Sequence, residues 1–406
     1  MPKAPTSYFL KRMAIEKAIA AERATRAALA AEHSDDNQAS DIEGLRLLFK
    51  RTGGLEGSWH ESWGYTNEKE QRLAKFSGVR VSDDGEHVVD LMLSSNGLNN
   101  EPSLNLDGND YGAGMNLLVF LESLNLRGNR LAGSLEDACG SACTLSRSDQ
   151  FHKRTHHFRN LRNLDFSRNQ YTGSFPRILC EIPTLEWLDI SRNELGGEVP
   201  QTISKLTNLK LLNVSWNNLS GKIPSRGLRT LGRLQGLNVA NNNLTSKLSD
   251  DVSRLTSLVV LNCSNNRLTG NLPVLTNLLN LKRFCIAGNT LTGPLGEDTL
   301  MGLSSLTRLD LSANCFTGPL PESISELINL RWLSLAQNSL TGLFPYDVLL
   351  ALAEKPNLRT VDFSANSQMI FSKEEVRTIR KAYPPSFELI LDEEPEVISE
   401  APEPDQ

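Results

Sequence analysis

Two thiols and two imidazoles lie close together in segment 136–158, and they are the clearest candidates for chemistry in this sequence. Cys139 and Cys143 are separated by three residues, and so are His152 and His156. Thiolate and imidazole groups are ligands that tetrahedral zinc prefers. The eight residues between the two pairs make a shorter gap than the usual zinc finger has, and a basic loop is the simpler interpretation. Zinc is therefore a hypothesis for this segment, and metal analysis of the purified protein would test it.

Other catalytic signatures are missing from the sequence. It contains no glycine-rich phosphate-binding loop, no nucleophile elbow and no HExxH metalloprotease motif. Acidic residues recur throughout the chain, so a pair of carboxylates in one place indicates no particular reaction. We therefore expect a protein that is not an enzyme.

The segment 136–158 interrupts a sequence repeat, and this repeat must position every candidate side chain. Its clearest copy is the pattern LxxLxIxxNxLxG, which begins at Leu185. Upstream copies begin at Leu121 and Leu161, which leaves room for an insertion of about 16 residues, and a weaker copy begins at Leu358. A fixed period of this size predicts a solenoid, because one unit is too small to bury its own apolar face. The first leucine recurs after steps of 23 to 25 residues at Leu209, Leu234, Leu258, Leu281, Leu306 and Leu330.

Alternation within each copy predicts a short strand with one buried face. Leu188 and Ile190 flank Asp189, which is the two-residue period of a strand. We expect the asparagine at the ninth position to satisfy backbone groups where the chain turns after this strand. The second half, with its Gly-x-apolar-Pro pattern, is expected to run extended before one short inward helical turn. The ninth-position residues are Asn129, Asn169, Asn193, Asn217, Asn242, Asn266, Asn289, Asn314, Asn338 and Asn366.

The complete pattern LxxLxLxxNxLxGxIPxxIxxLxx resembles the plant-type leucine-rich repeat family over residues 88–370. This resemblance implies an α/β fold: a curved, right-handed leucine-rich repeat solenoid with a parallel β-sheet on its concave face. Residues 45–96 resemble the N-terminal cap of non-secreted algal, protist and bacterial relatives. Secreted plant members carry Trp and Cys where Phe76 and Val81 stand here, so no cap disulfide is expected. The matching cap residues are Leu48, Thr52, Gly53, Gly54, Trp59, Trp63, Gly78, Val79 and Val81.

The third and eighth repeat positions vary between copies, as the positions of a recognition surface should. They hold Trp and Arg, the residue types enriched at interface hot spots. Two interpretations remain open: these side chains bind a protein partner on the concave face, or each packs flat against its neighbours along the sheet. The Asn and Asp residues at the fifth position are interpreted as structural. The candidate partner-binding residues are Arg168, Trp187, Arg192, Trp216, Arg283, Arg308 and Trp332.

The two ends of the chain differ from the repeats. Residues 1–40 contain an Ala-rich helical extension and a linker. A solvated helix, a docking helix and a mitochondrial transit peptide are the alternatives for this extension, and its glutamates fit the last poorly. Residues 41–87 are expected to form the N-terminal cap, residues 371–387 the C-terminal cap, and residues 388–406 a disordered acidic tail.

Composition limits the classes of function. The formal net charge of −6 argues against a nucleic-acid binder that relies on bulk charge. No apolar run reaches 18 residues and no secretory signal is visible, and the six cysteines are scattered, so we expect a cytoplasmic protein without a membrane span. The preferred hypothesis is a non-catalytic protein–protein interaction scaffold of undetermined oligomeric state. The alternatives are the ligand-recognition ectodomain of a receptor-like or secreted defence protein, and a structural subunit of a large assembly.

Overall fold

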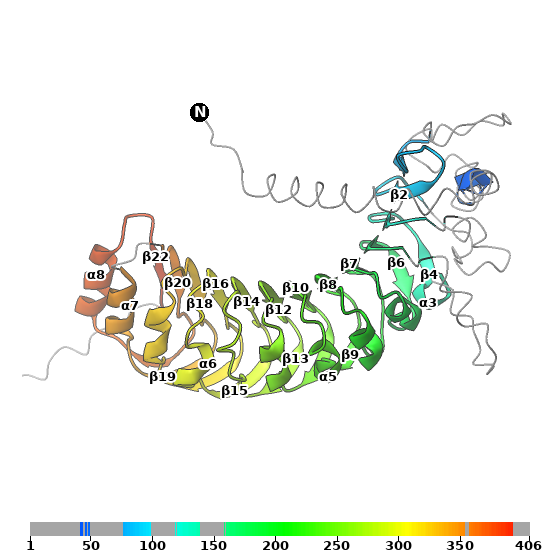
Figure 1. The fold of residues 1–406 in the computed structure, drawn as a ribbon. Coiled ribbons are helices and arrows are strands. Elements are labelled where there is room, and N and C mark those ends of the chain that lie inside the picture. Colours follow the sequence, from blue (N-terminus) through cyan, green and yellow to red (C-terminus); the bar gives the residue numbers. More distant parts are fainter. Residues whose placement is uncertain are drawn as a thin grey trace, which may run out of the picture.

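The chain folds into one curved stack of coils (Figure 1). Successive coils lie side by side in chain order, and the solenoid predicted from the repeat is confirmed. Predictions for residues 1–40, 139–157 and 393–406 fall outside the described part of the chain, as do those for Trp59 and Trp63 of the cap. The computed structural model describes residues 41–43, 45–46, 48, 76–98, 118, 120–138, 158, 160–353 and 357–392.

The first strand of each coil contributes to a 13-stranded sheet that lines the concave side (Figure 1). β1 (Val79–Val81) pairs antiparallel with β2 (Val88–Met92), and all later pairs are parallel. The third, fourth and fifth repeat positions pair with the same positions of the next coil. The remaining strands, in order, are β3 (Ser123–Asn125), β5 (Asn163–Asp165), β7 (Trp187–Asp189), β8 (Leu211–Asn213), β10 (Gly236–Asn238), β12 (Val260–Asn262), β14 (Arg283–Cys285), β16 (Arg308–Asp310), β18 (Trp332–Ser334), β20 (Thr360–Asp362) and β22 (Glu388–Ile390).

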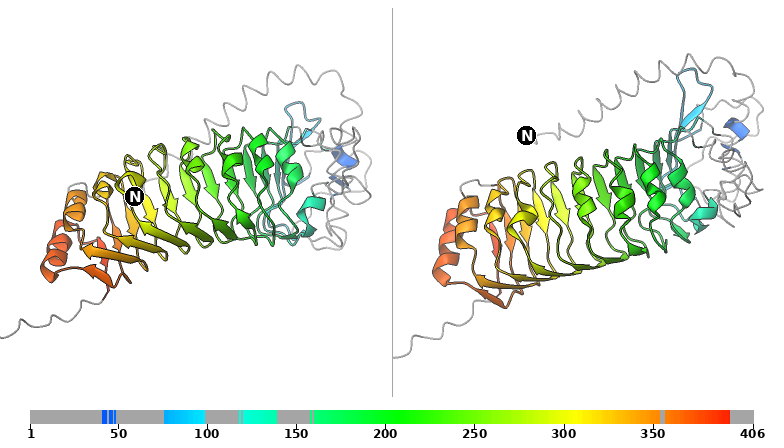
Figure 2. Two further views of the ribbon diagram at one scale, coloured as in Figure 1. Left: turned by 90° about the horizontal axis from the view of Figure 1, so that it is seen from below. Right: turned by 60° about the horizontal axis from the view of Figure 1, so that its bottom comes forward.

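The extended second half of the coils forms a further parallel sheet, which the sequence did not predict. It has seven strands and follows the chain order along another side of the solenoid (Figure 2). Extended backbone was expected in this half of the repeat. Whether neighbouring coils hydrogen-bond there depends on how closely they stack, and the sequence of one repeat does not show this distance. Its strands are β9 (Ser220–Lys222), β11 (Asn243–Ser246), β13 (Arg267–Gly270), β15 (Thr290–Pro294), β17 (Cys315–Gly318), β19 (Ser339–Leu343) and β21 (Gln368–Ile370), and β4 (Ala132–Ser134) pairs separately with β6 (Gln170–Thr172).

Short helical turns close most coils on the convex side, as the proline pattern predicts. In η5 (Gln201–Lys205), Pro200 precedes the turn and Ile203 is buried. Because a proline fixes φ and cannot donate from its backbone nitrogen, it marks the start of the turn and prevents the helix from continuing far upstream. The other helical elements are α3 (Leu135–Ala138), η4 (Arg177–Glu181), α5 (Ser225–Leu228), η6 (Asp250–Arg254), α6 (Glu297–Leu300), η7 (Glu322–Glu326), α7 (Tyr346–Ala353) and α8 (Lys373–Ala382).

The core is a continuous column of aliphatic side chains between the concave sheet and the convex side of the coils. Leu188, Leu212 and Leu237 are at most 1% exposed, which confirms that the ladder residues point inward. Cys263 takes the place of an aliphatic residue and is also fully buried. Each buried aliphatic side chain contributes about 1.5–3 kcal/mol. The stack therefore gains its stability from contacts between neighbouring coils.

The ninth-position asparagines join each coil to the preceding one. The side-chain nitrogen of Asn217 donates to the carbonyls of Ile190 and Val214, both at 3.1 Å, and its oxygen accepts from the backbone N–H of Leu195 at 3.0 Å. Equivalent bonds occur from Asn129 through Asn366. The structural role predicted for these buried amides is thus confirmed.

The C-terminal end is covered by α7 and α8, and α8 begins with a capping box formed by Ser372 and Glu375. α8 lies within residues 371–387, the segment expected to form the C-terminal cap. The predicted acidic tail, however, does not begin at residue 388, because Glu388–Ile390 forms β22 and extends the sheet beyond β20. Within the described residues, no helix is both long and apolar enough to cross a membrane.

A buried carboxyl group joins the N-terminal cap to β2. Asp41 is 1% exposed, its Oδ2 accepts from the Val88 N–H at 2.7 Å, and His87 Nδ1 lies 3.8 Å from the same oxygen. Burial raises the pKa of Asp41 from its ordinary value of 3.8 to about 7, and burial lowers the pKa of His87. The folded cap therefore favours the protonated acid and the neutral imidazole.

This burial predicts a pH-dependent stability of the cap. Between about pH 4 and pH 7, the unfolded chain has released the Asp41 proton while the folded chain retains it, so stability should fall as the pH rises. Relative to Asp41→Asn, the wild type should lose up to about 4 kcal/mol across this window. Because His87 is present in both proteins, the difference isolates Asp41. Urea unfolding at several pH values measures it, and a constant difference would contradict the prediction.

Candidate protein-binding face

The third repeat position forms one row of side chains across the concave sheet. Trp187 pairs with Leu211, and the row continues through Gly236 to Val260. The indole of Trp187 is 46% exposed, while Leu211 and Val260 are half-buried beside it. These residues make a small apolar area in the middle of the sheet. Leu211 was missed from sequence, although its place at a variable third position was the available signal.

Trp216 adds a second exposed indole on the next coil. It is 51% exposed, and the guanidinium carbon of Arg192 lies 4.8 Å from the centre of its ring. Such a cation–π contact holds both side chains in one orientation before any partner arrives. We call Trp187, Arg192, Leu211 and Trp216 the aromatic patch. Two large indoles at adjacent coils, beside a positioned arginine, form the arrangement typical of an interface hot spot.

The eighth repeat position differs from the prediction in its backbone. Arg168, Arg192 and Trp216 were expected to face outward from the strand, but their φ values are +57°, +56° and +57°. They therefore lie in the tight turn after the strand, in the left-handed region. This conformation costs a residue with a Cβ about 1–2 kcal/mol. The turn recurs in every coil, so the fold supplies these strained positions at the edge of the concave face.

The strained backbone predicts that Trp216 can be removed without loss of stability. In Trp216→Gly, the glycine adopts the left-handed turn without a Cβ penalty, and only a half-exposed side chain is lost. The free energy of unfolding, measured with urea, should stay within about 0.5 kcal/mol of the wild-type value or rise. A large destabilisation would show that the indole is a packing residue, which is the alternative interpretation.

Arg283, Arg308 and Trp332 continue the third-position row toward the C-terminus. The Arg308 guanidinium lies 4.5 Å from the centre of the Trp332 ring and also bonds Asp310 at 3.2 Å. Trp332 is only half-buried, but its indole nitrogen is fully covered. Much of the Trp332 side chain is therefore covered by packing along the sheet. Arg283 is exposed, and Arg168 is exposed farther toward the N-terminus.

Ion pairs flank the aromatic patch at the second repeat position. Glu186 accepts from Arg162 at 3.0 Å and also pairs with Lys210, so three successive coils are linked. These pairs are partly or largely exposed, and each contributes at most about 1 kcal/mol. Two bases share one acid, so the trio leaves a net positive charge beside Trp187.

The concave sheet also carries a cysteine thiol. Cys285 lies on the concave sheet, and burial raises the pKa of its thiol, which makes it a poor nucleophile at neutral pH. In the described residues, no group of three or more His, Cys, Asp or Glu side chains is arranged to hold a metal ion. The proposed zinc ligands Cys139, Cys143, His152 and His156 lie outside those residues, so zinc remains a prediction.

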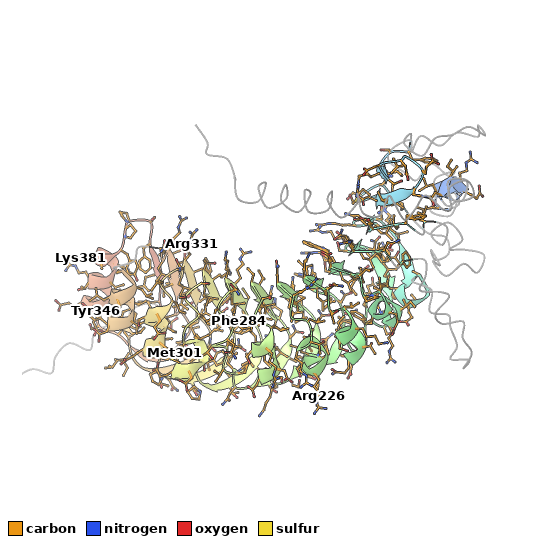
Figure 3. All side chains as sticks on the ribbon, viewed as in Figure 1. Arg226, Phe284, Met301, Arg331, Tyr346 and Lys381 are labelled. Atoms are coloured by element: carbon orange, nitrogen blue, oxygen red, sulfur yellow. The ribbon has the colours of Figure 1, made fainter. Side chains whose placement is uncertain are left out.

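Exposed apolar side chains also occur away from the concave sheet. Leu279, in the turn before β14, is 59% exposed, and Met301, at the end of α6, is 43% exposed. Leu343 and Ile370 are paired neighbours on β19 and β21 and are 77% and 66% exposed. Figure 3 shows Met301 and Arg226 on the side opposite Arg331, with Phe284 in the interior. Unlike the indole of Trp216, these aliphatic side chains have no ring on which a cation–π contact could form. They provide controls for tests of the concave face.

Comparison with protein-family models identifies the repeat directly. A model described as a leucine-rich repeat region matches residues 140–385, which is more than half of the chain. A second model, for a single leucine-rich repeat, matches residues 120–142. Among curated protein sequences, none matches the chain significantly.

Solved structures with this architecture include several plant receptors. The crystal structure of a TDR receptor is 27% identical, and the match covers 75% of this chain and 47% of that one, with a TM-score of 0.60. The Arabidopsis receptor kinase HAESA, solved with the peptide hormone IDA and the co-receptor SERK1, is 26% identical, with 83% and 58% of the two chains covered and a TM-score of 0.54. A plant ice-binding protein shares the fold at 21% identity, with 77% and 90% covered and a TM-score of 0.59. The chain thus spans about half the length of the receptor structures it matches.

Proposed function

Because this chain belongs to the leucine-rich repeat family, we propose that it is a non-catalytic protein-binding module whose concave sheet holds the partner. The partner is a protein or peptide that buries the aromatic patch. Coils that are already stacked present a large area with little conformational entropy left to lose on binding. We further propose that the module acts as an intracellular scaffold.

The pair of half-exposed indoles, Trp187 and Trp216, is the observation that carries this proposal. Burying the apolar area of a large aromatic side chain stabilises a complex at about 25 cal/mol per Å². Arg192, already placed on Trp216, would lose little side-chain freedom when a partner covers it. Similar receptors support the choice of ligand class, since HAESA was solved with a peptide hormone and RGFR1, 28% identical, with RGF2.

The second candidate is the ligand-binding part of a receptor or secreted protein, which the similarity to plant receptors favours. The cysteines support the intracellular alternative, because Cys180, Cys263, Cys285 and Cys315 are free thiols in the described part of the chain. Asn218 distinguishes the two, since it is exposed and lies in an Asn-Leu-Ser sequon. A glycan on Asn218 of the native protein would favour the secreted class, and an unmodified side chain in a cytosolic fraction would favour the scaffold.

The test of binding compares two double variants on opposite sides of the solenoid. Proteins that co-purify with the tagged chain from native cells are compared between wild type, Trp187→Ala/Trp216→Ala and Leu279→Ala/Met301→Ala. The proposal predicts a partner that is retained by wild type and the convex control but lost by the tryptophan variant. Retention of every partner by the tryptophan variant would refute the concave-face proposal, provided that circular dichroism shows equal folding.

A further inference from the structure

Five cations gather on the C-terminal half of the concave side. Arg283 and Arg308 lie at paired third positions of β14 and β16, and Lys282, Arg331 and Arg359 immediately precede β14, β18 and β20. Figure 3 shows Arg331 projecting from this side. We call these five residues the basic strip. Four of them are exposed, and Arg308 is half-buried.

Most of the basic strip has no acidic partner within the described structure. Arg308 pairs with Asp310 at 3.2 Å, but no ion pair joins the other four cations to a described acid. Asp362 and Glu388 are the next acids on this part of the sheet. Asp362 accepts from the Ser364 N–H and hydroxyl, and Glu388, the strand partner of Thr360, is exposed and has no ion pair with a described cation. Unpaired cations on adjacent coils repel one another, so an anionic segment across them would be stabilised.

The chain itself provides a segment of opposite charge. Residues 393–406 contain six acids, Glu393, Glu394, Glu396, Glu400, Glu403 and Asp405, and no base. These six account for the whole formal net charge of −6, so the rest of the chain is neutral. Three prolines favour an extended backbone. An extended acidic segment is the chemical complement of a straight row of cations.

The fold places the start of this segment beside the basic strip. β22 pairs with β20, and the Asp392 carboxylate accepts from the Ala365 N–H, in the turn after β20, at 2.5 Å. Neighbouring strands are about 4.8 Å apart, so the strip from β20 to β14 extends about 14 Å. Fourteen residues reach about 45 Å when extended. Residues 393–406 are therefore long enough to turn back and follow the whole strip.

We propose that residues 393–406 bind in cis across the basic strip and shield the C-terminal half of the concave face. Carboxylates of the segment pair with Arg283, Arg331 and Arg359. Any external acidic ligand must then displace the segment, which makes the strip selective for ligands that bind it more tightly. This interaction is separate from the aromatic patch, so its test does not depend on the proposed partner.

The test measures binding of a fluorescein-labelled peptide with the sequence of residues 393–406 to full-length proteins by fluorescence anisotropy. In the first variant all six acids are neutralised (Glu393→Gln, Glu394→Gln, Glu396→Gln, Glu400→Gln, Glu403→Gln and Asp405→Asn). The second adds Arg283→Glu, Arg331→Glu and Arg359→Glu to it. The matched control instead adds Lys222→Glu, Arg226→Glu and Arg229→Glu, three exposed cations away from the strip.

The neutralised protein should bind the peptide at least about tenfold more tightly than wild type, because the cis segment no longer competes. Binding to the neutralised protein should weaken at about 0.5 M salt and vanish in the strip variant. It should persist in the control, and also when Trp187→Ala/Trp216→Ala is added to the neutralised protein. Equal affinity for wild type and neutralised protein would overturn the proposal, because the cis segment would then not occupy the strip. Absence of binding to the neutralised protein, or undiminished binding to the strip variant, would overturn it as well.

Discussion

Phe284→Ala is expected to lower the free energy of unfolding by about 3–5 kcal/mol, the usual cost of emptying a buried aromatic site. Phe284 is fully buried at the fourth repeat position, in β14, and its strand partners are Leu261 and Leu309. Leucine occupies this position in both neighbouring coils, so the alanine would leave a cavity between two rigid layers. Neighbouring coils cannot close it without shifting the strand register. Urea unfolding followed by circular dichroism measures the loss.

The control for this prediction is Phe284→Leu, which restores the residue found in the neighbouring coils. It should cost less than about 1.5 kcal/mol, because the substituent is apolar and already fits the stack. If alanine and leucine were equally tolerated, the aliphatic column would not be the main source of stability. An equal large loss in both would indicate that this coil requires the aromatic ring itself.

Asn217→Ala is expected to destabilise the protein by about 1–3 kcal/mol, although it removes only a small polar side chain. The buried N–H of Leu195 loses its acceptor, and the carbonyls of Ile190 and Val214 each lose one of two donors, since they keep their bonds from Asn193 and Asn242. A buried polar group without a hydrogen bond costs about 1–3 kcal/mol. Since these groups belong to two coils, the variant should also loosen the junction between them. Hydrogen exchange at Leu195 should therefore accelerate.

Asn218→Ala is the matched control, because the neighbouring asparagine is exposed. It should change the free energy of unfolding by no more than about 0.5 kcal/mol. Similar losses in Asn217→Ala and Asn218→Ala would contradict the structural role of the ninth position. The comparison distinguishes the loss of buried hydrogen bonds at Asn217 from the intrinsic backbone preference of asparagine, which both substitutions remove.

The architecture was predictable because the repeat constrains the same few positions many times. Leu188 had to point inward once it alternated with Asp189 at a strand period, and the asparagine had to follow the strand. The Trp and Arg residues at variable positions could also be assigned to the concave side. Of these, Trp187 and Trp216 are exposed, so both remain candidates for contact with a partner.

The structural features that the sequence did not predict depend on contacts between coils, and a single repeat does not encode these contacts. The second sheet arises from the stacking distance of extended segments such as β15 and β17. The positive φ of Trp216 arises from the turn that the buried asparagine holds, and no residue-type preference indicates it. Trp332 could not be distinguished from Trp187 in sequence, because only the position of Arg308 in space shows that it packs along the sheet. The start of the acidic tail was misplaced because β22 is stabilised by pairing with β20 rather than by its own composition.

Solvent protection in the complex tests most directly whether the concave sheet holds the partner. Hydroxyl-radical footprinting of the chain with its co-purified partner reports the accessibility of individual tryptophan and methionine side chains. We expect the partner to protect Trp187 and Trp216 strongly from oxidation, while Met301 on the convex side stays as reactive as in the free protein. Protection of Met301 with unchanged reactivity of both indoles would contradict it.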